Sequence, residues 1–155
     1  MNYRLELKKG ILLNDYNIFI EWGMSIQDFL KKIGTIGDVE KTKNDEFSVA
    51  TYAIKSKVLD LEDEITLSFS FVKGNMVSIN FGKIAKNDNI EANFNATQCF
   101  LESKFGKPGL LSTVTSNIIN SKGEHTYKWK IGQATIVHSI YNNFGLVESL
   151  EIIVK

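Results

Sequence analysis

The sequence predicts an α+β fold, in which a mostly antiparallel, twisted β-sheet carries two short amphipathic helices on one face. Three observations lead to this prediction. Apolar and polar residues alternate along many runs of the chain, which is the pattern of half-buried strands. Short turns separate these runs and favour antiparallel neighbours over crossover connections. Helical spacing occurs in only two segments, and each has a capping residue before it and a glycine after it.

The first part of the chain predicts three strands and a helix. Residues 3–8 alternate as a strand does, and residues 11–13 and 16–20 form two more apolar runs around a turn at Asn14-Asp15. Ser25 is the expected N-cap of the first helix, and Asp28 completes a weak capping box. Four apolar side chains of this helix share one face, and Gly34 ends it: Ile26, Phe29, Leu30 and Ile33.

The middle of the chain predicts a loop, a strand and a hairpin. Residues 34–47 are polar and are expected to form a loop, whereas residues 48–58 alternate as a strand. An acidic connector follows at residues 60–64. Residues 65–71 and 76–81 then form the two arms of a hairpin around the turn Lys73-Gly74-Asn75.

The second helix is expected between Asn95, as N-cap with Gln98 as its capping-box partner, and Gly106, with Pro108 preventing its extension. Four of its side chains are expected to face the core: Ala96, Phe100, Leu101 and Phe105. The rest of the chain predicts four strands, at residues 111–119, 125–131, 133–141 and 146–154.

A chain of 155 residues with 43% hydrophobic and 23% charged residues has the composition of an ordinary globular protein. Its length is sufficient for a core that needs no metal or disulfide. We expect a single α+β domain over residues 1–155, because no sharp linker divides the chain. Each half has a capped helix followed by strands, so internal duplication is one interpretation; the other is that any two short helices need caps.

The net charge is zero, from 18 basic and 18 acidic residues, and Arg4 is the only arginine. General nucleic-acid binders carry a basic excess, so no nucleic-acid partner is expected. No run of apolar residues is long enough for a signal peptide or a membrane span. We therefore expect a soluble, cytoplasmic protein without a membrane partner, present as a monomer or a weak dimer.

No motif indicates an enzyme, a metal site or a cofactor. Cys99 is the only thiol, and its place near the apolar face of a helix predicts a buried structural residue. His125 and His138 lie too far apart for a typical zinc ligand pair; His125 is expected to be solvated and His138 to be packed or at an edge. Trp129 is expected in the core, with base stacking as a minor alternative.

The strongest local charge feature is the acidic connector. Its four carboxylates form either a solvated turn or a contact patch for a basic partner, because negative charge accelerates association with a positive protein. The hairpin of residues 65–81 is either interior or has a free edge that accepts a strand from another chain. The predicted partner-binding residues are Asp60, Glu62, Asp63, Glu64, Lys73 and Asn75.

Two short segments carry a resemblance to a known class of protein: Glu21-Trp22-Gly23-Met24-Ser25 before the first helix, and Phe105-Gly106-Lys107-Pro108 after the second. With the lysine- and asparagine-rich composition of an AT-biased genome, they resemble immunity proteins of bacterial contact-dependent growth inhibition and related polymorphic toxin systems. The resemblance implies a non-enzymatic cytoplasmic protein that binds one cognate toxin domain, often a nuclease, and blocks its active site. Some such complexes combine strand addition with charge complementarity.

The sequence is also compatible with two other functions. One is an envelope or assembly module built from helix-plus-sheet repeats. The other is a small-ligand-binding domain with a cavity between sheet and helices, lined by Phe29, Phe100, Phe105 and Trp129.

Overall fold

The computed structural model describes residues 3–44, 48–84, 89–108, 125–142 and 145–155. The expected strand at residues 111–119 lies outside the described residues. The elements in chain order are α1 (Tyr3–Leu7), β1 (Gly10–Leu13), β2 (Ile18–Glu21), α2 (Ile26–Ile33), β3 (Val39–Asn44), β4 (Val49–Ser56), β5 (Ile65–Val72), β6 (Asn75–Phe81), α3 (Ile90–Phe105), β7 (His125–Ile131), β8 (Ala134–Asn142) and β9 (Leu146–Val154).

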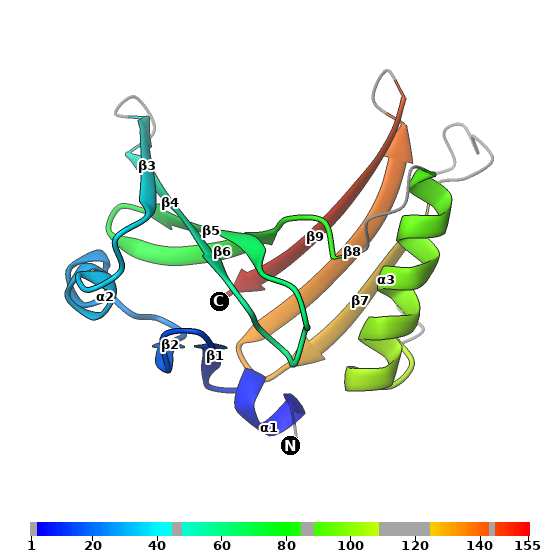
Figure 1. Cartoon of the computed structure of the whole chain (residues 1–155), viewed down its shortest axis with the longest axis horizontal. Coiled ribbons are helices and arrows are strands. Elements are labelled where there is room, and N and C mark those ends of the chain that lie inside the picture. The colour runs from blue at the N-terminus through cyan, green and yellow to red at the C-terminus, as the bar shows by residue number, and fades with distance from the viewer. Residues whose placement is uncertain (1–2, 45–47, 85–88, 109–124, 143–144) are drawn as a thin grey trace.

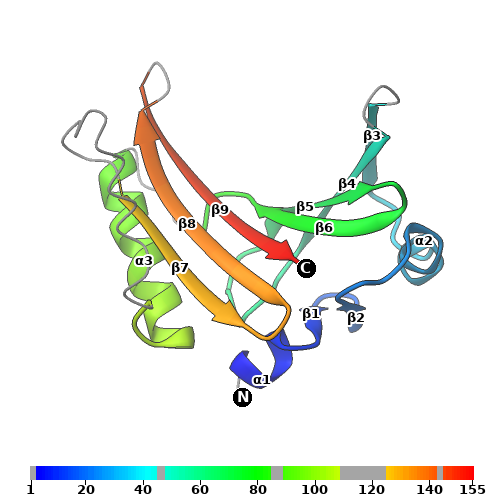
Figure 2. The same ribbon diagram turned by 180° about the vertical axis from the view of Figure 1, so that it is seen from behind.

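Seven of the strands form one antiparallel sheet in the order β3-β4-β5-β6-β9-β8-β7, and β1 and β2 form a separate hairpin. Figures 1 and 2 show that the large sheet is strongly curved. Along the chain, β3 to β6 pair with one another in order before α3, and β7 to β9 pair in order after it. Helix α3 connects β6 to β7. The predicted α+β class, with a mostly antiparallel sheet and short helices, is confirmed.

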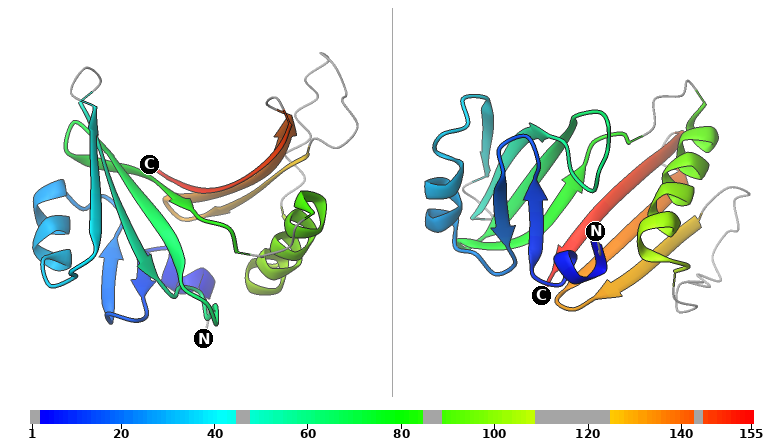
Figure 3. Two further views of the ribbon diagram at one scale, coloured as in Figure 1. Left: turned by 45° about the horizontal axis from the view of Figure 1, so that its top comes forward. Right: turned by 60° about the horizontal axis from the view of Figure 1, so that its bottom comes forward.

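All helices and the β1–β2 hairpin lie on the convex face of this sheet, as the left panel of Figure 3 shows. The strand register explains why, because it aligns one mostly apolar row of side chains across the sheet. From edge to edge the row consists of Lys41, Tyr52, Phe69, Ile79, Ile152, Ile136 and Trp129. The core therefore forms between this face and the elements that cover it.

Helix α2 covers one end of this face as predicted. The Ser25 hydroxyl accepts a hydrogen bond from the backbone N–H of Asp28 at 3.2 Å, which confirms the N-cap. Phe29 is fully buried, and its ring centroid lies 4.9 and 5.0 Å from those of Phe71 and Phe69. Leu30, which was expected to face the core, is 39% exposed on the outer side.

Helix α3 covers the other end but begins earlier than predicted. Its N-cap is Asn89, whose side-chain oxygen accepts from the N–H groups of Glu91 and Ala92. The prediction of Asn95 as N-cap was wrong, because Asn89 caps the helix at an earlier position. Ala96, which was expected to face the core, is exposed. The predicted end is confirmed: Gly106 adopts φ +73°, a backbone conformation that favours glycine.

The N-terminal segment forms the short helix α1 and not the predicted strand. Leu5 and Leu7 would share a face in a strand, but Leu7 is buried and Leu5 is 57% exposed. The Trp22 indole N–H donates to the backbone oxygen of Leu7 at 2.6 Å and fixes the end of this helix against the core. A segment of this length has too few residues for its apolar pattern to distinguish a helix from a strand.

Residues 39–44 form the edge strand β3, although residues 34–47 were predicted as a loop. Their sequence Val-Glu-Lys-Thr-Lys-Asn lacks the apolar alternation of a half-buried strand, and Lys41, Thr42 and Lys43 are exposed. Edge strands are commonly rich in charge because charge opposes pairing with another chain. The backbone of β4 therefore holds this strand in place through antiparallel pairing.

Candidate functional site

The concave face of the large sheet is the most distinctive surface of the described part of the chain. We call it the open face, defined as the residues of the large sheet whose side chains point away from α2 and α3. No described helix or strand covers it, as Figures 1 and 3 show. One of its rows crosses all seven strands: Thr42, Thr51, Ser70, Ser78, Ile153, Thr135 and Lys130.

The central part of the open face is rich in hydroxyl groups and poor in charge, whereas the edge strands β3 and β7 add Glu40, Lys128 and Lys130 to it. The five central strands β4, β5, β6, β9 and β8 place only two charged side chains on it among the described residues, Lys55 and Glu151. Thr51 and Ser70 pair through their hydroxyls at 3.4 Å. The apolar side chains on it include Ile153 and Tyr141, which are 38% and 40% exposed.

The acidic segment Asp60–Glu64 connects β4 to β5, and its four carboxylate residues are all exposed. The Asp60 carboxylate lies 3.9 Å from the ammonium of Lys104 on α3. Leu59 and Asp60 both adopt left-handed backbone conformations, at φ +55° and +58°. Such conformations cost about 1–3 kcal/mol each and persist only where the surroundings enforce them.

Buried contacts hold the backbone of the acidic segment in these left-handed conformations. Val58 is fully buried and Leu59 is 7% exposed, so both anchor its N-terminal side. The Asp15 carboxylate accepts a hydrogen bond from the backbone N–H of Lys57 at 2.6 Å. The segment therefore presents its carboxylates from a fixed loop.

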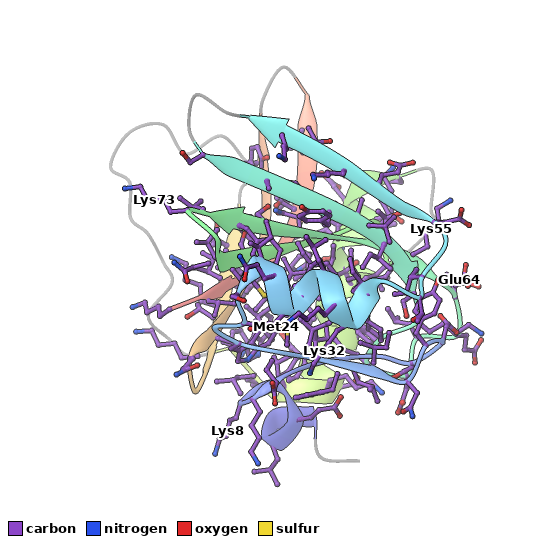
Figure 4. All side chains as sticks on the ribbon, turned by 90° about the vertical axis from the view of Figure 1, so that its left-hand side faces the viewer. Lys8, Met24, Lys32, Lys55, Glu64 and Lys73 are labelled. Carbon is purple, nitrogen blue, oxygen red and sulfur yellow. The ribbon has the colours of Figure 1, made fainter. Side chains whose placement is uncertain are left out.

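The structure separates the six predicted partner-binding residues into two groups. Asp60, Glu62, Asp63 and Glu64 precede β5, whereas Lys73 and Asn75 flank the turn that follows it. Figure 4 shows Glu64 near Lys55 at one end of the β4–β5 pair and Lys73 at the opposite end. The second group lies beside α2, because the N–H of Ile26 donates to the carbonyl of Gly74 at 2.9 Å.

The hairpin of residues 65–81 is interior, so it has no free edge. Strand β5 pairs with β4 and strand β6 pairs with β9. Of the two alternatives, the interior hairpin is therefore the one that the structure shows, and strand addition to this hairpin is excluded where β4 and β9 pair with it. The two edges of the large sheet are β3 and β7.

Cys99 is exposed, so the prediction of a buried cysteine was wrong. The helix begins at Ile90, and its buried face passes through Thr97, Gln98 and Leu101, which leaves position 99 on the outer side. Trp129 is buried as predicted, and its indole N–H donates to the carbonyl of Gly106 at 2.7 Å.

Sequence reasoning missed a buried polar network centred on His138. This imidazole is fully buried, stacks on Phe94 at a centroid distance of 4.2 Å, and bonds through both nitrogens. Nδ1 lies 2.8 Å from the Gln98 side-chain oxygen, and Nε2 lies 3.1 Å from Oε1 of Glu148. The one available signal was a histidine within an apolar strand, which does not identify its partners. His125, in contrast, is exposed as predicted.

The orientation of Gln98 determines where the protons of this network lie. Its amide nitrogen donates to Glu102 at 2.7 Å, so its oxygen faces His138 and accepts the Nδ1 proton. Nε2 of His138 lies 3.1 Å from Glu148 Oε1 and forms the second hydrogen bond of the imidazole. The network thus fixes the Glu148 carboxyl group in place.

The described residues contain no group of three or more metal-ligating side chains. No helix among them has the length and apolar character required to cross a membrane. Comparison with family models, with curated proteins and with solved structures gives no match.

Proposed function

We propose that this chain is a non-enzymatic protein-binding module, an immunity protein that binds a cognate bacterial toxin domain and blocks its active site, and that the open face is its contact surface. The observation that carries the proposal is the composition of that face. In a chain that is 23% charged, the five central strands place only Lys55 and Glu151 there. Interface centres are depleted in charge in the same way.

The size of the open face fits a specific protein interface. Seven strands at the usual spacing of ~4.8 Å, each contributing about 23 Å of length, present roughly 700 Å². A standard interface covers about 800 Å² on each partner. Ile153 and, nearer the β8–β9 turn, Tyr141 supply exposed apolar side chains on this face, and tyrosine is enriched among the residues that dominate binding energy.

The acidic segment contributes at the rim in this proposal. Its carboxylates lie on a fixed loop at the end of the β4–β5 pair, where they would attract a basic toxin surface before contact. Exposed rim charges change association rates more than final affinity. We therefore assign Asp60, Glu62, Asp63 and Glu64 to steering and the open face to affinity.

Co-expression with the product of the adjacent gene tests the proposal. We expect the two proteins to co-purify, and we expect Ser149→Lys, on the open face of β9, to weaken binding at least tenfold. Ser103→Lys on the outer side of α3 is the matched control and should bind normally. Failure of the adjacent product to bind refutes the toxin partner, and full-strength binding by Ser149→Lys refutes the open face as the contact surface.

Replacing all four carboxylates of the acidic segment with alanine tests the steering role separately. We expect a slower association rate that loses its salt dependence, with little change in the dissociation rate. Unchanged association kinetics would show that the acidic segment is only a solvated turn.

A further inference from the structure

A small pocket lies on the other side of the sheet from the open face, between α3, β9 and the residues that follow β6. Its volume is about 190 Å³, and its lining includes Phe81, Lys83, Ile84, Thr97, Glu148 and Leu150. None of the aromatic side chains predicted to line a cavity contributes to it. A cavity of roughly 150 Å³ accommodates benzene in another protein, so this pocket has room for a slightly larger molecule.

The first sign of a ligand is the hydroxyl group of Thr97. This residue is 1% exposed, and its Oγ1 atom has no hydrogen-bond partner among the described residues. A buried hydroxyl without a partner is costly and rare in folded proteins. Because Thr97 lines the pocket, a polar atom bound there would satisfy it.

The second sign is the Glu148 carboxyl group. Its Oε1 atom contacts His138, while its Oε2 atom has no hydrogen bond to the described residues. The side chain is only 12% exposed and lies in the pocket wall. His138 is in turn held by Gln98 and by stacking on Phe94, so the carboxyl group is fixed before any ligand arrives.

The remaining wall is mostly apolar. Phe81, Ile84 and Leu150 line it, and the exposed residue Lys83 adds one positive charge. We propose that the pocket binds a small aliphatic molecule that carries a protonated primary amine. The ammonium donates hydrogen bonds to Glu148 Oε2 and Thr97 Oγ1, and the aliphatic body packs on the apolar wall.

This chemistry occurs both in simple alkylamines and in free amino acids, and Lys83 distinguishes the two. An amino acid also brings a carboxylate, which the Lys83 ammonium would bind. Three probes separate these cases: isoamylamine carries the amine alone, isovalerate carries the carboxylate alone, and L-leucine carries both. The site is independent of toxin binding, because it lies on the opposite face of the sheet.

The test is titration of the ¹⁵N-labelled chain with each probe, followed by amide chemical shifts. We expect isoamylamine or L-leucine to shift residues around the pocket, and isovalerate to shift none. Thr97→Val and Glu148→Gln should each weaken amine binding at least tenfold. Glu151→Gln, which lies on the open face of the same strand, is the matched control and should bind as the unmodified chain does.

Lys83→Gln identifies the source of the amine. If this substitution lowers the affinity for L-leucine alone, the ligand is an amino acid. If it lowers the affinity for neither probe, the ligand is an alkylamine. Since Glu148→Gln disturbs His138, Thr97→Val provides the test that leaves the buried network intact. Absence of shifts with every probe at millimolar concentration would overturn the proposal, and would mean that water alone satisfies Thr97. Equal amine binding by Thr97→Val and the unmodified chain would also overturn it.

Discussion

Thr97→Val measures directly what an unsatisfied hydroxyl costs this fold. The Thr97 side chain is 1% exposed and its Oγ1 has no partner among the described residues, so the folded state loses hydration there and gains no hydrogen bond. That loss costs about 1–3 kcal/mol. Valine has nearly the same shape and a similar helix propensity, so the substitution removes the cost without opening a cavity. We therefore expect Thr97→Val to stabilise the ligand-free protein.

The expected gain is large enough for a thermal melt. In a domain of this size each kcal/mol shifts Tm by roughly 2–4 °C, so Tm should rise by about 2–12 °C in circular dichroism or calorimetry. Thr51→Val is the matched control, because the Thr51 hydroxyl is paired with Ser70 and its loss should leave Tm unchanged or slightly lower. An unchanged or lower Tm for Thr97→Val would contradict an unsatisfied Thr97 hydroxyl, since it would mean that bound water already satisfies this group.

Three further predictions concern the core, the buried network and the thiol. Phe29→Ala removes a fully buried ring that contacts three other aromatic rings, and should lower the free energy of unfolding by about 3–5 kcal/mol in urea titration; a loss below 1 kcal/mol would contradict the described packing. Glu148→Ala leaves a buried nitrogen of His138 without its partner and should cost about 1–3 kcal/mol, whereas Glu151→Ala on the open face should change stability by less than ~0.5 kcal/mol; equal effects would argue against the network. Cys99 should react with a disulfide reagent in the native protein as readily as in urea, and protection in the native state would contradict its exposure.

Local signals predicted the elements that local chemistry determines. The α2 cap needs only Ser25 and the backbone of Asp28, and the β5–β6 hairpin needs only alternation and the Lys73-Gly74 turn, where both residues adopt positive φ. These interactions lie within a few residues of one another along the chain. These two elements can therefore be predicted from the local sequence.

The errors occurred where distant residues decide the structure. Strand β3 is held by the backbone of β4 and has no apolar alternation of its own. The α1 segment alternates as a strand would, but its contact with the Trp22 indole holds it as a helix end. Cys99 was misplaced because α3 buries the polar side chains of Asn93, Thr97 and Gln98 where apolar residues were expected. Apolar spacing alone does not identify the buried face of a helix that buries polar groups.

The candidate site was only partly predictable for the same reason. Alternation in each strand identifies two faces, but it does not reveal which strands are neighbours or whether a helix covers a given face. Pairing of β6 with β9 creates the open face by joining strands from the two halves of the chain. His138 lies 40 residues from Gln98 and 10 residues from Glu148, on the neighbouring strand, so no short sequence motif identifies this network.

Cross-saturation NMR of the complex with the adjacent gene's product shows which face of the sheet the partner covers. The chain offers exposed methyl groups on both sides: Ile153 on the open face, at 38% exposure, and Leu30 and Leu5 on the opposite side, at 39% and 57%. Saturation of the unlabelled partner should transfer to Ile153 and Val137 and leave Leu30 and Leu5 unaffected. Transfer to Leu30 or Leu5 with none to Ile153 would contradict the account, because the partner would then lie on the helical side of the sheet.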